Sequence, residues 1–131
     1  MDPQVILAET YNLFSVSDII ENGSEIDREL EGLLADRDYD NMAKTIIYAL
    51  MHTLNNDPAY RNIRQIYFND AIDLLYMIDR MGFNNERIMK KFINLLYQFY
   101  SYSLQYKIQF IVDKEKRELV KAKLDELIHI I

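Results

Sequence analysis

The chain of 131 residues has no cysteine and no tryptophan, and it has only three glycines and two prolines. Without cysteine it can form no disulfide, no thiolate metal site and no cysteine nucleophile. A sheet protein of this length would need many tight turns, and turns depend on glycine and proline. The composition therefore favours helices joined by short loops.

The signatures of common enzymes and metal sites are missing as well. Three glycines cannot build a phosphate-binding or dinucleotide-binding loop, and no G-x-S-x-G motif occurs. His52 and His129 lie far apart in the chain and do not show the spacing of metal ligands. Asp70, Asp73 and Asp79 are interpreted as the solvated face of a helix rather than as an acid–base pair. We therefore predict a protein that is not an enzyme and that has no cofactor and no metal.

The acidic run at 36–40 resembles the beginning of a calcium-binding loop. Such a loop needs glycine at its sixth position and glutamate at its twelfth, where this chain has Asn41 and Ile47. The run is therefore predicted to cap the next helix instead.

Length and patterning predict a single all-α domain over residues 1–131. Half of the residues are hydrophobic and 27% are charged, which is ordinary for a folded domain. Apolar residues recur at helical spacing between stop and start signals. The signals are Asp2-Pro3, Asn22-Gly23 followed by Ser24, the loop at 36–40, the loop at 55–58, Gly82 and Asn84-Asn85. They predict a compact bundle of five or six helices.

The segment 92–112 is the most aromatic part of the chain. It holds seven of the sixteen aromatic residues and one formal charge, Lys107. Its apolar residues fit one face of a helix, but residues 100–110 also alternate strictly as in a strand. A strand over 100–112 would need a ladder partner that no other segment supplies. We predict a helix, with the strand as the alternative.

The tyrosines of this segment are candidates for an interface. Tyr97, Tyr100, Tyr102 and Tyr106 are spread around the axis of a helix, so they cannot all face one small core. A wide core with neighbours on several sides is the alternative explanation. With the apolar end of the chain, the interface hypothesis comprises Tyr97, Tyr100, Tyr102, Tyr106, Phe110, Leu127, Ile130 and Ile131.

Charge is unevenly distributed along the chain, whose net charge is −6. Residues 1–57 hold twelve acidic and three basic residues, whereas residues 58–131 hold nine and twelve. Such a dipolar chain could associate with its acidic part against the basic part of another copy, although the charges could equally serve to solvate the surface. The acidity argues against nucleic-acid binding.

The chain shows neither a signal peptide nor a segment apolar enough to span a membrane. Segment 92–112 has roughly the length of a span, but it contains several amides, serines and one lysine. We therefore expect a soluble protein that does not bind membranes.

The chain is rich in Ile, Asn, Tyr and Lys, as are products of AT-rich genomes. In size, composition and expected architecture it resembles the coat proteins of spindle-shaped archaeal viruses, although no motif carries the resemblance. The resemblance implies a helical-bundle subunit that self-associates into the shell of a virion.

Three functions remain in view. The first is a non-enzymatic protein that acts by self-assembly as a homo-oligomer. The second is an adaptor or inhibitor that binds a different protein, and the third is a helical nucleic-acid-binding regulator.

Overall fold

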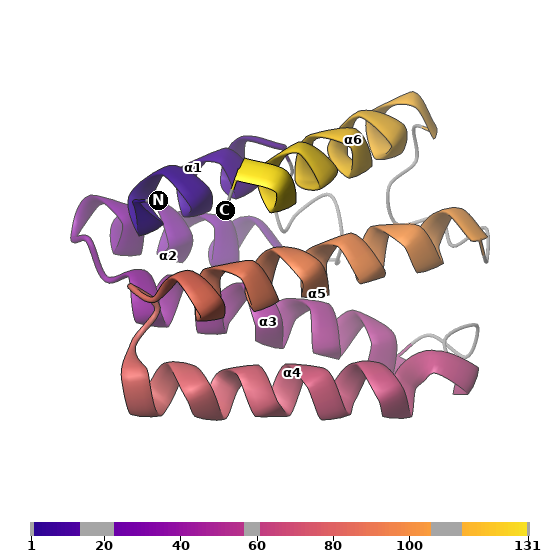
Figure 1. Cartoon of the computed structure of the whole chain (residues 1–131), viewed down its shortest axis with the longest axis horizontal. Helices are drawn as coiled ribbons and strands as arrows, with labels where there is room; N and C mark the ends of the chain where they lie inside the picture. The colour runs from indigo at the N-terminus through magenta and orange to yellow at the C-terminus, as the bar shows by residue number, and fades with distance from the viewer. Residues whose placement is uncertain (1, 14–22, 57–60, 106–113, 131) are drawn as a thin grey trace.

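The computed structural model describes residues 2–13, 23–56, 61–105 and 114–130. These residues form six helices and no strand, which confirms the predicted all-α bundle (Figure 1). The helices are α1 (Pro3–Leu13), α2 (Gly23–Ala35), α3 (Tyr39–Asn56), α4 (Arg61–Met81), α5 (Glu86–Gln105) and α6 (Lys114–Ile130).

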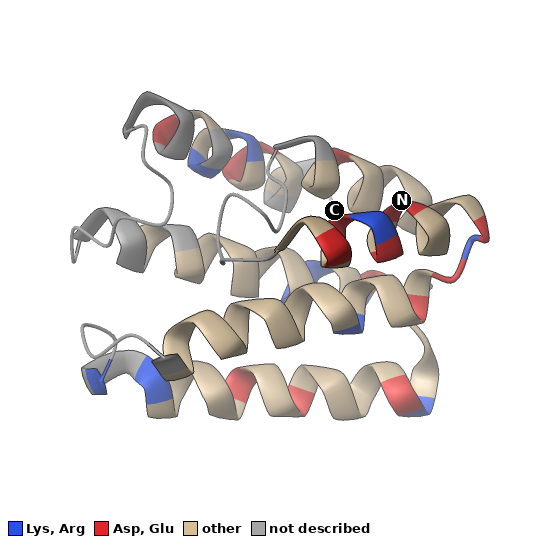
Figure 2. Cartoon of the chain, turned by 180° about the vertical axis from the view of Figure 1, so that it is seen from behind, with Lys and Arg blue, Asp and Glu red and all other residues tan. Residues whose placement is uncertain are grey.

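The last four helices run antiparallel to one another in chain order. Helix α4 packs on α3, α5 packs on α4, and α6 returns over α5, while α1 and α2 cover the other side of α3. The first and the last helix come close together (Figures 1 and 2). An ion pair of 4.0 Å between Lys123 Nζ and Glu9 Oε2 joins α6 to α1 there. Helices α1 and α6 thus close the bundle on one side.

The helix boundaries depend on side chains that satisfy free backbone groups at the helix ends. Asp2 Oδ1 accepts from the backbone N–H of Gln4 at 2.9 Å, and Pro3 takes the first helical position. Asp38 and Asn85 cap α3 and α5 in the same way, with bonds of 3.3 and 3.2 Å. Gly82 follows α4 with a φ of 79°, a conformation that glycine adopts without strain. These predicted boundaries are confirmed.

One boundary differs from the prediction. The sequence assigns Asn22-Gly23 to the end of a preceding helix and Ser24 to the start of the next, whereas α2 begins at Gly23 itself. Glycine is tolerated at a helix start as well as after a helix end, so the dipeptide does not fix the direction. Where the preceding helix would end lies outside the described residues.

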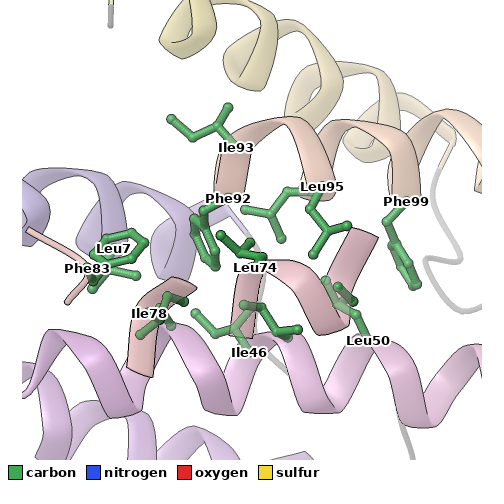
Figure 3. Packing of buried hydrophobic residues seen from close by; sticks show 14 of the residues in the cluster. Leu7, Ile46, Leu50, Leu74, Ile78, Phe83, Phe92, Ile93, Leu95 and Phe99 are labelled. Atoms are coloured by element: carbon green, nitrogen blue, oxygen red, sulfur yellow. The ribbon is translucent and has the colours of Figure 1, made fainter. Parts of the chain in front are cut away.

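The core is one continuous cluster to which α5 contributes most broadly. Phe92, Leu95 and Phe99 point from α5 toward α3 and α4, while Ile93 points to the other side, toward α6 (Figure 3). The ring of Phe92 meets that of Phe83 edge-on, with centroids 5.2 Å apart. Helix α5 is buried over a wide arc because neighbours flank it on both sides, which agrees with the wide core given above as the alternative to an interface.

The helix predicted for segment 92–112 is confirmed as far as residue 105, and the alternative interpretation as a strand is wrong. The alternative strand over 100–112 does not form where the structure describes it, since residues 100–105 belong to α5; no strand lies among the described residues to pair with it. Ile66, which is apolar and lies next to the buried Tyr67 of α4, is 60% exposed. The buried stripe follows Tyr67, Leu74 and Ile78, and a neighbouring residue is rotated by about 100° from it.

The contact between α1 and α2 predicts a stability change at high pH. The Tyr11 hydroxyl donates to Glu31 Oε1 at 2.7 Å, and this bond to a carboxylate raises the pKa of Tyr11 to about 12. Because the folded-state pKa lies above the ordinary value of 10.0, the contribution is complete below pH 10 and disappears as the pH rises toward 12.

Urea unfolding of wild type and Tyr11→Phe between pH 8 and 12 tests this expectation. The two proteins should differ most below about pH 10 and converge toward pH 12. In a Glu31→Gln background the acceptor is kept but its charge is removed, so the pKa of Tyr11 should rise less. The stability difference made by Tyr11→Phe in that background should therefore be smaller and should vanish at a lower pH. A constant difference across the whole range would show that the hydrogen bond to Glu31 is not the cause.

Candidate interaction surface

The predicted interface residues that the structure describes do not form an open face. Tyr97 is half-buried against the core, and the Lys121 ammonium lies 5.5 Å from the centroid of its ring. Leu127 is only 3% exposed and belongs to the core of its own chain. Tyr100, Tyr102 and Ile130 lie in α5 and α6, but their side chains are outside the described set, as are residues Tyr106, Phe110 and Ile131 altogether.

Large exposed apolar side chains gather instead on α3 and α4. Tyr48 is 56% exposed, Ile72 54% and Tyr76 62%. We call Lys44, Tyr48, Ile72, Tyr76 and Asp79 together the outer α3–α4 face. Exposed single apolar residues are common on proteins, whereas exposed apolar residues that gather on neighbouring helices make such a face a candidate contact surface.

An ion pair fixes the register of this face. Lys44 Nζ on α3 lies 2.6 Å from Asp79 Oδ1 on α4. Because the two helices are antiparallel, one turn forward from Lys44 and one turn back from Asp79 lead in the same direction. Tyr48 therefore lies at about the level of Tyr76 along the helix axes, and Ile72 lies one turn further along α4.

Most charges on this face already interact with groups of the same chain. The hydrogen bond to Asp79 raises the pKa of Lys44, with burial acting in the opposite direction and the charge of Asp79 adding to the rise. The Arg80 guanidinium lies 5.6 Å from the centroid of the Tyr76 ring. A partner covering the centre of this face would therefore meet apolar rings and a charge that is already paired.

A polar groove runs along the other side of α4, between α4 and α5. Its volume is about 240 Å³, and Leu74 and Leu95 contribute its apolar lining. The remaining lining residues are polar or charged: Asp70, Asp73, Lys91, Asn94 and Gln98. Asp70 and Asp73 are exposed, as predicted for a solvated helix face, while Gln98 Oε1 is buried and has no hydrogen-bond partner among the described residues. The groove is lined by no hydroxyl group and could hold polar groups of a partner.

The residues considered for metal binding include two exposed histidines and two aspartates that accept hydrogen bonds from backbone N–H groups. His52 and His129 are both exposed and lie on different helices, α3 and α6. Asp38 caps α3, and Asp40 Oδ1 accepts from the backbone N–H of Phe83 at 2.7 Å. Across the described ranges, no group of three or more His, Asp or Glu is arranged to hold a metal ion.

No helix in the described part of the chain combines the length and the apolarity needed to cross a membrane. Helix α5, which contains much of segment 92–112, is one of the helices to which this applies.

Comparison with known proteins gives no family for this chain: no family model, no curated protein and no solved structure matches it. Inferences about its function therefore depend on the surfaces described above.

The sequence of α4 does indicate that Ile72 and Tyr76 belong to a different helix face from the buried stripe. Ile72 and Tyr76 are four residues apart and share a helix face with Asp79, whereas the buried stripe of α4 follows Tyr67 and Leu74. Apolar residues that align with charged ones, and not with the buried stripe, are expected to be exposed.

Proposed function

We propose that this protein is not an enzyme and acts by self-association, using the outer α3–α4 face as a contact surface. The supporting observation is the exposure of three apolar side chains, those of Tyr48, Ile72 and Tyr76. They lie near two opposite charges, Lys44 and Asp79, that pair with each other within the chain. Tyrosine is favoured at protein interfaces because its ring buries a large apolar area while its hydroxyl stays available for hydrogen bonds.

The paired charge matters because an unpaired buried charge opposes association. Covering Lys44 or Asp79 alone would cost several kcal/mol, as is typical for an uncompensated ion. Since Lys44 and Asp79 lie 2.6 Å apart, a partner can cover them together. Ile72 is 54% exposed, so covering it favours association by roughly 1 kcal/mol, and the two tyrosine rings add to that.

A structural subunit of a larger shell is the assembly that we propose, in keeping with the resemblance to viral coat proteins; its location would then be the virion. A contact that uses the same face on both subunits closes at a dimer, so a shell needs a second and different contact. The interface hypothesis for Tyr100, Tyr102, Tyr106 and the end of the chain supplies candidates for that second contact.

The groove between α4 and α5 favours a second candidate function, an adaptor or inhibitor of another protein. Its lining of Asp70, Asp73 and Lys91 can accept polar side chains of a partner. The two functions differ in what the isolated protein does, since an adaptor remains monomeric until its partner is added.

Substitutions on the outer α3–α4 face test the proposed function. Tyr48→Gln combined with Tyr76→Gln should weaken self-association by about tenfold or more, because two aromatic anchors are lost. Glutamine suits a helix, so folding should be retained. Leu119→Gln is the matched control, since Leu119 is 70% exposed but lies on α6.

Sedimentation velocity and thermal unfolding should be measured for wild type, the double variant and the control. Weaker association of the double variant alone, with unchanged melting, supports the proposal. Equal association of all three proteins would show that the outer α3–α4 face is not the contact.

A further inference from the structure

A single line of side chains runs along the outer side of α4. Its members follow one another at intervals of three or four residues, which places them on one face of the helix. They are Arg61, Gln65, Phe68, Ile72, Tyr76 and Asp79. All of them are exposed except Phe68, which is half-buried against the core.

This line is symmetrical in chemistry about its middle. Arg61 and Asp79, of opposite charge, lie at equal distances on either side of residue 70, and so do the two apolar residues Phe68 and Ile72. Gln65 and Tyr76 also lie at nearly equal distances on either side of residue 70. A helix with this arrangement is complementary to a second copy of itself that runs in the opposite direction.

We propose that the partner on this surface is a second copy of the chain, with the two α4 helices packed antiparallel about a two-fold axis near Asn69. The inference rests on the proposed self-association and specifies its geometry. Arg61 of each copy then faces Asp79 of the other, and Phe68 faces Ile72. Such a contact is isologous, because the same residues serve on both sides.

The charges support this register. Arg61 is exposed and makes no ion pair within the described part of the chain. The Asp79 side chain is 60% exposed although Lys44 contacts one of its oxygens, so the other oxygen can accept from a second cation. In Figure 2 the beginning of α4 is basic and the acidic residues follow further along the helix, and Asp79 is the one of these acids that belongs to the line.

Alternative packings of the same face are disfavoured by charge. A parallel pair of α4 helices would place Arg61 beside Arg61 and Asp79 beside Asp79, and like charges in contact oppose association. The antiparallel pair replaces both repulsions by two attractions. The ends of the line are 18 residues apart, about 27 Å at the rise of an α-helix, so the two ion pairs hold the helices at both ends.

Charge reversal in two separate variants tests this geometry. Arg61→Asp alone places two acids opposite each other, and Asp79→Lys alone places two bases opposite each other. Each variant should therefore self-associate more weakly than wild type by about tenfold or more.

Mixing the two variants should restore association. In an equimolar mixture, the aspartate introduced into one chain faces the lysine introduced into the other, and the unchanged Arg61 and Asp79 face each other at the opposite end. A heterodimer should therefore form. Thermal unfolding of each variant checks that both are folded.

A cysteine placed near the axis gives a second, independent readout. The chain has no cysteine of its own, so Asn69→Cys introduces the only thiol. Because position 69 lies beside the proposed axis, two copies should be joined by a disulfide under mild oxidation. Ser24→Cys, an exposed position on α2, serves as the control and should react much more slowly.

The possible results separate the two proposals. Heterodimer formation in the mixture together with selective cross-linking at position 69 supports the antiparallel α4 contact. The contact would be overturned if wild type dimerises but mixing the two variants restores no association and Asn69→Cys cross-links no faster than Ser24→Cys. That result would leave self-association in place. A protein that stays monomeric at every concentration would overturn both proposals.

Discussion

Replacing Phe92 with alanine is expected to lower the free energy of unfolding by about 3–5 kcal/mol, as is typical for removing a phenylalanine from a core. Phe92 is fully buried at the point where α5 meets α3 and α4, and its ring packs edge-on against Phe83. The loss combines transfer of the ring, an unfilled cavity and the ring–ring contact. Domains of this size have only about 5–15 kcal/mol of stability, so much of it would disappear.

Thermal and urea unfolding measure this effect, and Ile66→Ala on α4 is the control. Ile66 is 60% exposed, so its truncation should change stability by no more than about 0.5 kcal/mol. The melting temperature of the Phe92→Ala variant should fall by at least roughly 12 °C, with about 4 °C lost for each kcal/mol. Similar losses for the two variants would contradict the helix faces described for α4 and α5.

Replacing Asp40 with alanine is expected to destabilise the protein by about 1.5 kcal/mol, because hydrogen bonds to charged groups contribute more than neutral ones. Asp40 Oδ1 accepts from the backbone N–H of Phe83 at 2.7 Å and so joins the start of α3 to the turn between α4 and α5. Without it, that N–H loses its partner in a part-buried position. Asp40→Asn, which keeps an acceptor oxygen, should lose less.

Neighbouring acids of the same loop provide matched comparisons. Asp38→Ala should cost about 1 kcal/mol, because the cap of α3 is lost. Asp36→Ala should have almost no effect, because the Asp36 side chain is exposed and makes no hydrogen bond or ion pair among the described residues. Urea unfolding should rank the three alanine variants with Asp40 first and Asp36 last. Equal effects would show that only the net charge of the loop matters.

Much of the fold could be predicted because its determinants are local in the chain. Asp2-Pro3, Asp38, Gly82 and Asn85 satisfy free backbone groups within a few residues, so their roles follow from the sequence alone. The scarcity of glycine and proline indicated helices because a sheet protein of this length would need many tight turns. The strand alternative over 100–112 arose because alternation can also occur by chance on a helix that is buried on several sides.

Contacts between distant residues could not be predicted in this way. Asp40 and Phe83 are 43 positions apart, and nothing local indicates that a carboxylate at the start of α3 accepts from the turn after α4. The register of α3 and α4 that aligns Tyr48 with Tyr76 likewise depends on how the two helices pack. Leu127, proposed for an interface, lies in the core because α6 folds back over α5.

Sedimentation equilibrium of the unmodified chain over roughly 1 µM to 1 mM tests the central claim most directly, since this range covers the dissociation constants of weak and moderate complexes. Self-association predicts an average mass that rises with concentration from the 15.7 kDa of one chain to at least twice that value. A mass that stays at 15.7 kDa throughout would contradict it.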